Sequence, residues 1–164
     1  MTTNSLPGKE IQIYTDGAAS GNPGPGGFGV VLKYKHNRKE MSRGYEKTTN
    51  NRMELLAVIV ALEQLKQEGC RVTVHTDSRY VSEAINRGWL FDWERKNFRK
   101  RKNPDLWKRF LAVYRKHDVQ IIWIKGHTDN IENNRCDKLA VEAYQSGKLI
   151  TDEGYVSDDQ LIMD

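Results

Sequence analysis

The chain has 164 residues, of which 38% are hydrophobic and 29% charged, a composition that excludes intrinsic disorder and suits one domain with a single core. Its longest apolar run, Leu55–Leu62, is too short to cross a bilayer, the N-terminal residues lack the apolar stretch of a secretory signal, and two cysteines exclude a disulfide framework. We therefore expect a cytoplasmic protein with no membrane partner, and the net charge of +4 mildly indicates a nucleic-acid partner.

The first half of the chain is predicted to hold three strands and a long helix. Residues 10–16 alternate apolar and polar side chains, as a half-buried strand does. A glycine-rich bend at 21–29 leads into strands at 29–36 and 41–46, which form an antiparallel meander joined at 37–39. Residues 48–69 then form a helix that is capped near Thr49 or Asn50 and stopped by Gly69.

The second half alternates strands and helices. A fourth strand at 70–77 precedes a short helix at 78–88, an aromatic and basic segment at 88–103, and a helix at 103–117 with Pro104 at its start. A fifth strand at 118–126 and a last helix at 131–146 follow. We predict an α/β fold, a five-stranded mixed sheet flanked by helices, with a flexible leader (1–9), one folded domain (10–147) and a loosely ordered acidic tail (148–164).

Positive charge is concentrated in one segment of the chain. Residues 87–109 hold nine basic and three acidic side chains, a formal charge of +6, so the rest of the chain sums to −2. Docking on a phosphate backbone requires a localised basic surface of this kind.

Two aspartates follow apolar strands in the same local pattern. Asp16 ends the predicted first strand and Asp77 the fourth, each after a threonine and before a small residue. If these strands are parallel neighbours, both carboxylates meet at one edge of the sheet, where open α/β sheets bind ligands. The alternative is that each aspartate caps a turn or, for Asp77, the helix that follows.

A glutamate and a third aspartate head apolar faces of helices. Glu54 shares a helix face with Val58, Ala61 and Leu65, and Asp137 precedes apolar residues at helical spacing, namely Ala140, Val141 and Tyr144. The helix dipole also favours a glutamate in the first turn. A carboxylate that is buried without a partner is unfavourable, however, so these two side chains and the two strand-end aspartates predict one acidic cluster.

Such a cluster needs compensating cations, because close carboxylates repel one another. Oxygen ligands, without Cys or His at zinc spacing, favour hard divalent ions such as Mg²⁺ or Mn²⁺. Two such ions about 4 Å apart promote in-line phosphoryl displacement. The residues therefore predict a metal-dependent nuclease or phosphotransferase.

The chain contains four long motifs in a fixed order, TDGAASGNPGPGGFG, TTNNRMEL, TDSRYV and KGHTDNIENNRCDKLA. Together they resemble the bacterial type 1 ribonuclease H family over roughly residues 10–155. The resemblance implies a ribonuclease H-like fold with a basic handle protrusion. It also implies hydrolysis of the RNA strand of RNA–DNA hybrids by a two-metal mechanism, leaving 3′-hydroxyl and 5′-phosphate ends, with Mg²⁺ as cofactor and Mn²⁺ as a substitute.

The resemblance assigns roles to individual residues. The metal-binding catalytic carboxylates are Asp16, Glu54, Asp77 and Asp137. His127 matches a loop histidine that assists proton transfer or product release, although a loop histidine read alone is usually just solvated. Contacts with the hybrid are implied for Asn22, Thr49, Asn50, Asn51 and Arg79. Helix capping by Thr49 or the asparagines is compatible with that role, and Ala19 and Arg79 depart from the family, which often has Cys and Gln there.

Residues 87–104 match the handle, which grips the DNA strand in this family and looks a few residues shorter here. Its implied contacts are two tryptophans and a basic run, Trp89, Trp93, Lys96, Arg99, Lys100, Arg101 and Lys102. Phe98 matches a third aromatic position. The alternative is that the aromatic side chains pack the handle onto the body, which we expect in part for Trp93.

Two other functions are weighed against this one. A catalytically silent module that only binds RNA–DNA hybrids would be expected to lack at least one carboxylate, and all four are present. A transposase or integrase core also uses an acidic cluster, but TTNNRMEL and the handle favour the ribonuclease H resemblance. We expect the protein to be a monomer.

Overall fold

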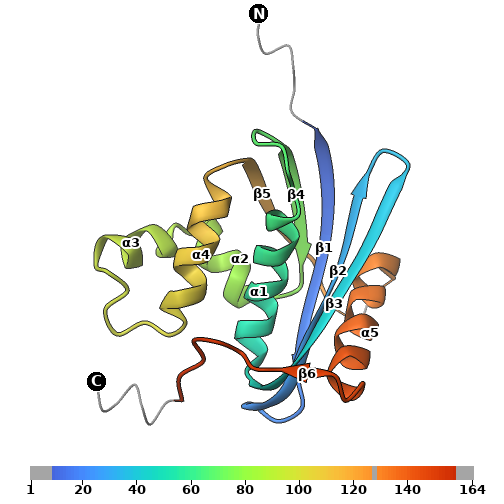
Figure 1. Cartoon of the computed structure of the whole chain (residues 1–164). Coiled ribbons are helices and arrows are strands. Elements are labelled where there is room, and N and C mark those ends of the chain that lie inside the picture. The colour runs from blue at the N-terminus through green and yellow to red at the C-terminus, as the bar shows by residue number, and fades with distance from the viewer. Residues whose placement is uncertain (1–8, 127–128, 158–164) are drawn as a thin grey trace, which may run out of the picture.

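The computed structural model describes residues 9–126 and 129–157, which form a mixed sheet with helices on both faces (Figure 1). The elements follow one another in the order β1 (Glu10–Ala19), β2 (Gly24–Tyr34), β3 (Asn37–Thr48), α1 (Asn50–Glu63), β4 (Arg71–Thr76), α2 (Arg79–Asn86), α3 (Trp89–Arg95), α4 (Pro104–Tyr114), β5 (Asp118–Trp123), α5 (Ile131–Gln145) and β6 (Leu149–Ile150). The predicted α/β fold is confirmed. In the described ranges, no helix has both the length and the apolar character that a membrane span needs.

The sheet has six strands in the order β5-β4-β1-β2-β3-β6. The first three strands form the predicted antiparallel meander, and β4 and β5 lie parallel to β1. The sequence predicted five strands. The sixth, β6, pairs Leu149 and Ile150 with Gly44 and Tyr45 of β3, and two residues are too few to produce a periodic pattern.

The glycine-rich segment at 21–29 was predicted to be a bend, but most of it is part of a strand. Residues from Gly24 onward belong to β2, and β1 continues beyond Asp16 to Ala19, because Asp16–Ala19 pair with Gly29–Gly26. A side chain at Gly27 or Gly29 would collide with the backbone of α5 at Ala140 and Cys136. The glycines therefore let α5 lie close on this face of the sheet.

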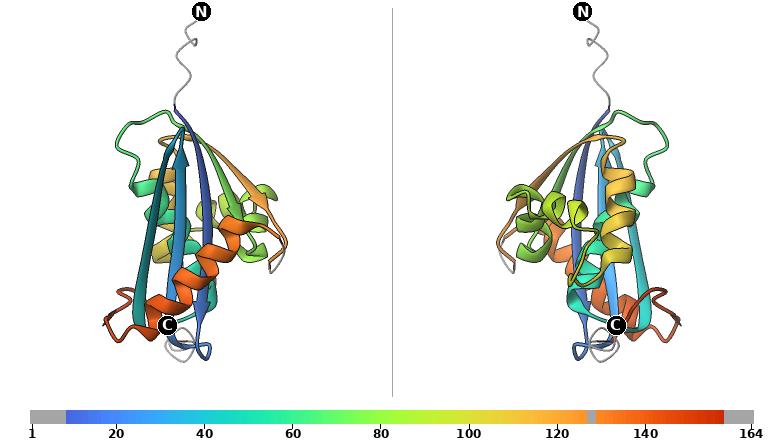
Figure 2. Two further views of the ribbon diagram at one scale, coloured as in Figure 1. Left: turned by 90° about the vertical axis from the view of Figure 1, so that its right-hand side faces the viewer. Right: turned by 90° about the vertical axis from the view of Figure 1, so that its left-hand side faces the viewer.

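The helices form two layers (Figure 2). Helix α5 packs across β1, β2 and β3, whereas α1 packs on β1 and β2 from the other side and contacts α4. The run Leu55–Leu62 is buried on all sides of α1, as expected for a helix enclosed between a sheet and a second helix layer. Helix α1 ends at Glu63 rather than near Gly69, because the residues that follow are mostly exposed and offer no further apolar face to bury.

The C-terminal segment up to Ser157 was predicted to be loosely ordered, and the structure corrects this. After β6 it crosses the N-terminal end of α1 toward α4 (Figure 1). Asp152 in this segment is 7% exposed and accepts hydrogen bonds from Thr48 and Arg52. These two partners lie about 100 positions earlier in the sequence, and local sequence patterns carry no signal for such distant contacts.

Candidate active site

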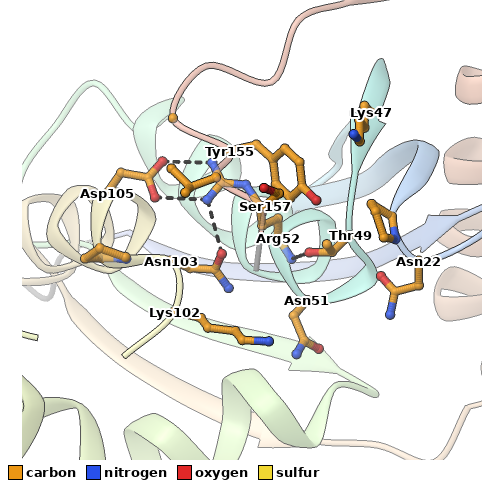
Figure 3. A pocket seen from close by; sticks show the side chains of 14 residues that line it. Asn22, Lys47, Thr49, Asn51, Arg52, Lys102, Asn103, Asp105, Tyr155 and Ser157 are labelled. Atoms are coloured by element: carbon orange, nitrogen blue, oxygen red, sulfur yellow. Dashed lines mark hydrogen bonds and ion pairs between the residues drawn. The ribbon is translucent and has the colours of Figure 1, made fainter. Parts of the chain in front are cut away.

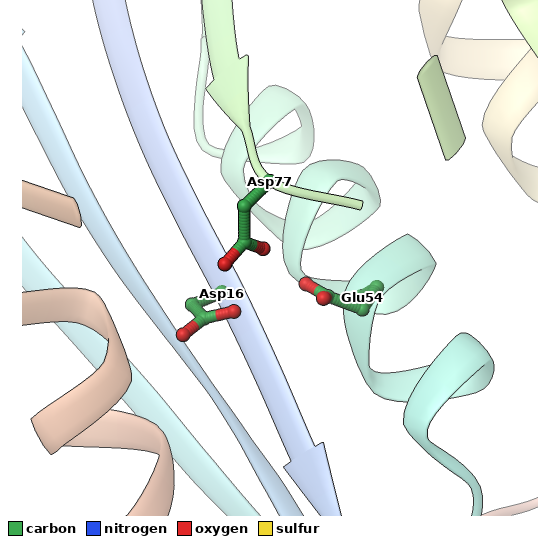
Figure 4. A group of neighbouring side chains, drawn as sticks. All are labelled: Asp16, Glu54 and Asp77. Carbon is green, nitrogen blue, oxygen red and sulfur yellow. The ribbon is translucent and has the colours of Figure 1, made fainter. Parts of the chain in front are cut away.

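Three of the predicted carboxylates converge at the C-terminal end of β4, beside the middle of β1 (Figure 4). Strands β1 and β4 are parallel neighbours with Thr15 opposite Thr76, so Asp16 and Asp77 lie side by side. Glu54, near the start of α1, points toward both from the helix layer. One carboxylate oxygen from each of the three side chains lies within 4.8 Å of the other two. The predicted meeting of the aspartates and the inward direction of Glu54 are confirmed.

The environment of Asp16 and Glu54 disfavours their charged forms. Burial, together with the charges of Asp77 and Asp137, raises the pKa of Asp16 to about 8. Burial and the charges of Asp16 and Asp77 likewise raise the pKa of Glu54 well above its usual value. Among the described atoms, Glu54 Oε1 is buried without a hydrogen-bond partner. An all-oxygen donor set with an unpartnered buried oxygen fits a hard divalent cation.

Asp137 lies beside this cluster rather than within it. It is carried by α5, on the opposite side of β1 from α1, and its negative charge contributes to the raised pKa of Asp16. In the described part of the chain the group within mutual ligand distance consists of Asp16, Glu54 and Asp77. The structure therefore brings three of the four predicted carboxylates together and places the fourth close enough to act on Asp16. His127 lies outside the described residues.

The position of Asp77 is fixed by the strand beside it. The indole Nε1 of Trp123 donates a hydrogen bond of 2.9 Å to the backbone carbonyl of Asp77. A Cβ at Gly126 would come within 2.5 Å of Asp77 Oδ2, so the chain after β5 passes directly over this carboxylate. The guanidinium of Arg79 stacks on the Trp123 ring at 4.0 Å from its centroid. The predicted substrate residue Arg79 is thus held next to the carboxylate cluster.

The polar residues before α1 form a hydrogen-bonded end to the helix. Thr49 is the N-cap, and its side chain accepts from the Arg52 backbone N–H, which decides between the two predicted capping residues. Asn50 donates its backbone N–H to Asn22 Oδ1 at 3.1 Å, and its own Oδ1 accepts from the Ala19 backbone at 2.7 Å. These two hydrogen bonds engage the side-chain amide oxygens of Asn22 and Asn50. The NH₂ group of each side chain can therefore donate to an acceptor such as a phosphate oxygen.

A groove of about 650 Å³ runs along this end of the helix layer (Figure 3). It is lined by predicted substrate residues, Asn22, Thr49, Asn51 and Lys102, and by residues that sequence reasoning missed, Lys47, Arg52, Asn103, Asp105 and Gly154–Ser157. Arg52 precedes an apolar run, but no local pattern indicated that its own side chain would be buried. The partners of Arg52 lie too far away in sequence to be predicted.

Comparison with known proteins agrees with this geometry. The family model described as RNase H matches residues 8–145. The chain belongs to the ribonuclease H family. Ribonuclease H of Desulforamulus reducens is 53% identical over 149 residues, which cover 88% of this chain and 93% of the relative. Ribonuclease HI of Helicobacter pylori is 52% identical over 144 residues, 87% of this chain and 99% of the relative.

Solved structures of ribonucleases H share the fold. The crystal structure of LC9-RNase H1 superposes with a TM-score of 0.78 at 28% identity and covers 96% of this chain and 85% of that one. That of LC11-RNase H1 in complex with RNA/DNA hybrid has a TM-score of 0.64 at 31% identity and covers 83% of this chain and 97% of that one. The predicted family and fold are both confirmed.

The segment that matches the ribonuclease H handle consists of α3 and the turns that follow it. Residues Trp93, Lys96, Arg99, Lys100 and Arg101 line a hollow of about 640 Å³. Trp89 is 43% exposed, whereas Trp93 packs edge-on against Trp107 with ring centroids 5.9 Å apart and carries Arg101 on its face. Phe98 is 6% exposed and belongs to the core. Trp93 therefore attaches the handle to the body, as expected in part, while the basic residues surround it.

Proposed function

We propose that this protein is an endoribonuclease that hydrolyses the RNA strand of RNA–DNA hybrids and leaves 3′-hydroxyl and 5′-phosphate ends. The observation that carries the proposal is the convergence of Asp16, Glu54 and Asp77, because their mutual repulsion and the burial of Asp16 and Glu54 favour a compensating cation. Membership of the ribonuclease H family supports the reaction and the hybrid substrate.

The carboxylates are proposed to hold two divalent metal ions, Mg²⁺ or Mn²⁺ in its place. Asp16, Glu54 and Asp77 supply oxygen ligands from three separate elements, and Asp137 supplies a fourth from α5. When bound, such ions lower the pKa of a coordinated water and neutralise charge on the scissile phosphate. The protein's own contribution is rigid placement, because β1, the end of β4 and the buried helix α1 fix the directions of the ligands. His127 is proposed to assist proton transfer or product release.

Two surfaces are proposed to hold the hybrid. The amides of Asn22, Asn50 and Asn51 surround the N-terminal end of α1, where a helix favours phosphate and where amides can bond to ribose 2′-hydroxyls. The basic handle residues are proposed to meet phosphates of the DNA strand, aided by the exposed ring of Trp89. The solved complex of LC11-RNase H1 with RNA/DNA hybrid supports this substrate. We also propose a cytoplasmic monomer.

Cleavage of matched duplexes tests the proposal. Labelled RNA–DNA, RNA–RNA and DNA–DNA duplexes of one sequence are incubated with the protein in Mg²⁺ and in Mn²⁺. We expect cleavage of the RNA strand in the hybrid only. Absence of cleavage with either metal, accompanied by tight binding of the hybrid, would instead identify a silent hybrid-binding module.

Replacement of Asp77 tests the metal role of the carboxylates. Asp77→Asn removes one charged ligand while it preserves the size of the side chain and the backbone bond to Trp123. We expect cleavage to fall to the background of the assay, with circular dichroism and the melting curve of a folded protein. Wild-type cleavage rates in this variant would refute the metal role of Asp77.

A further inference from the structure

Arg52 is a buried cation at the N-terminal end of α1. Its side chain is 1% exposed, yet it makes contacts with two other segments of the chain. The guanidinium donates to Asp152 from Nε (2.7 Å) and Nη2 (3.0 Å), and to both carboxylate oxygens of Asp105 (2.9 and 2.8 Å). Thr48 Oγ1 donates to the same Asp152 at 2.6 Å. Arg52 thereby joins α1, the start of α4 and the C-terminal segment.

This cation is held in its charged form by the two aspartates. Burial alone would lower the pKa of Arg52, but hydrogen bonds and charge interactions with Asp105 and Asp152 outweigh it and raise the pKa overall. A buried guanidinium with most of its donors engaged in this way has a fixed orientation, since any rotation would leave charged groups unpaired.

The fixed guanidinium also orients Asn103. Arg52 Nη1 donates to Asn103 Oδ1 at 3.2 Å, and Asn103 Nδ2 donates to Tyr80 Oη at 3.0 Å. Tyr80 Oη is itself fixed by a bond of 2.9 Å from Trp107 Nε1. Both ends of the Asn103 amide are therefore held, and the backbone at this residue is in the left-handed region with φ of 61°. Asn103 lies on the wall of the groove beside Lys102 (Figure 3).

The C-terminal segment forms part of the same wall. Gly154–Ser157 line the groove together with Asn22 and Thr49, starting two residues after the buried Asp152, and Figure 3 shows Tyr155 and Ser157 next to Arg52. The contacts of Asp152 therefore fix both the guanidinium that orients Asn103 and the chain that closes the groove. None of these residues belongs to the carboxylate cluster.

We propose that Arg52 and Asp152 are positioning residues through which the C-terminal segment sets the nucleic-acid affinity of the groove. They orient the Asn103 amide as a recognition group for the backbone of a bound strand, and they take no part in the chemical step. This inference rests on the proposed function, because it takes the bound strand to be that of an RNA–DNA hybrid.

The principal variant is Asp152→Asn, which keeps the size of the side chain and removes its charge. Thr48→Val is a milder variant that removes one hydrogen bond from the same carboxylate. Glu63→Gln is a control, because Glu63 also pairs α1 with α4, through Arg109 at 2.6 and 2.8 Å, but at the C-terminal end of α1 and the middle of α4, and neither residue lines the groove. Steady-state cleavage of the hybrid is measured for each variant well below its melting temperature.

The expected result is a division between binding and chemistry. Asp152→Asn raises KM about three- to tenfold, the range for one misaligned hydrogen bond, with kcat within about twofold of wild type. Glu63→Gln lowers the melting temperature without changing KM. In an Asn103→Ala background, Asp152→Asn no longer raises KM, because the residue through which it acts is gone. A role in stability alone predicts lower melting temperatures with unchanged KM, which would overturn the proposal.

An NMR measurement separates this inference from the proposed function. The side-chain NH₂ resonances of Asn103 are expected to shift in Asp152→Asn and to stay in place in Glu63→Gln. Unchanged Asn103 resonances in Asp152→Asn would overturn the positioning role whether or not hybrids are cleaved. If the wild-type protein cleaves no hybrid, the proposed function fails, while the resonances still decide whether Asp152 orients Asn103. An equal rise of KM with and without Asn103 would also overturn the proposed route.

Discussion

Asp16 and Glu54 lie in surroundings that favour their protonated forms, and this makes stability depend on pH. In the unfolded chain Asp16 releases its proton near its usual pKa of 3.8, whereas the folded protein retains it up to a pKa of about 8. Between these values the folded state binds more protons than the unfolded state, so stability is lost as the pH rises. Glu54 acts in the same direction.

We therefore expect the free energy of unfolding in metal-free buffer to fall as the pH is raised from about 5 to about 8. Each unit of difference between folded and unfolded pKa corresponds to about 1.4 kcal/mol, so the change should amount to a few kcal/mol. Urea unfolding in EDTA measures it. Saturating Mg²⁺ should remove the decline, because a bound cation stabilises the charged carboxylates, and Glu54→Gln should reduce it and raise the melting temperature in EDTA. Stability that rises over this range in EDTA would contradict the prediction.

The residues of the site that could be predicted from the sequence are those whose placement follows from a local pattern. The meeting of Asp16 and Asp77 followed from the Thr-Asp pattern that β1 and β4 share, although β1 continues past Asp16, and the direction of Glu54 followed from helical spacing, because both patterns are local. Asn103 and Lys47 carried no such pattern. The place of Asn103 in the groove depends on how α4 packs against α1, which involves contacts between residues some 50 positions apart, and Lys47 becomes part of a groove only because this second wall is present.

At the scale of elements, the spacing of apolar residues predicted the helices and strands that have one exposed and one buried face. Strand β4 and helices α2, α4 and α5 lie where the pattern indicated them, and β1 does so up to Asp16. The glycine-rich start of β2 was not predicted as a strand. Its glycines leave room for the backbone of α5, and in the sequence alone such a run of glycines resembles a turn. Element boundaries therefore failed where another element, rather than the local sequence, determines the backbone.

The handle offers the prediction that belongs to this scale. Replacing Lys96, Arg99 and Lys100 with Gln should weaken hybrid binding and lower the slope of log affinity against log salt by about 0.7–0.9 for each phosphate that is no longer neutralised. These three residues are chosen because Arg101 stacks on Trp93 and its removal would also disturb packing. Cleavage at saturating substrate should change little, since the carboxylate cluster is untouched.

A control for the handle variant removes the same charge elsewhere. Gln at Lys35, Lys39 and Arg71, on the β2–β3 hairpin and at the first residue of β4, lowers the net charge equally. We expect this control to keep a salt slope near that of wild type. Equal slopes for the two triple variants, measured by fluorescence anisotropy, would assign binding to net charge and refute a localised handle.

At the scale of the whole molecule, the C-terminal segment packs against residues from the first half of the chain. The bond between Arg52 and Asp152 spans 100 positions, and β6 adds a strand to the edge formed by β3. Part of the fold therefore depends on a segment that composition alone presents as an acidic tail. Asp152 contributes to the fold through its buried ion pair with Arg52, and the average charge of the segment does not indicate that pair.

Truncation tests this dependence. A chain that ends after Gly147 loses β6 and Asp152, and leaves the buried guanidinium of Arg52 with Asp105 as its remaining carboxylate partner. Breaking a buried pair by removal of one partner costs about 3–5 kcal/mol, and the retained Asp105 places the expected loss of unfolding free energy near the lower figure. A chain that ends after Ser157 keeps both features and should unfold at the urea concentration of the full chain. If the two truncated chains unfolded at the same concentration, the C-terminal segment would contribute nothing to the fold, and the ordering of the groove would have to come from α1 and α4 alone.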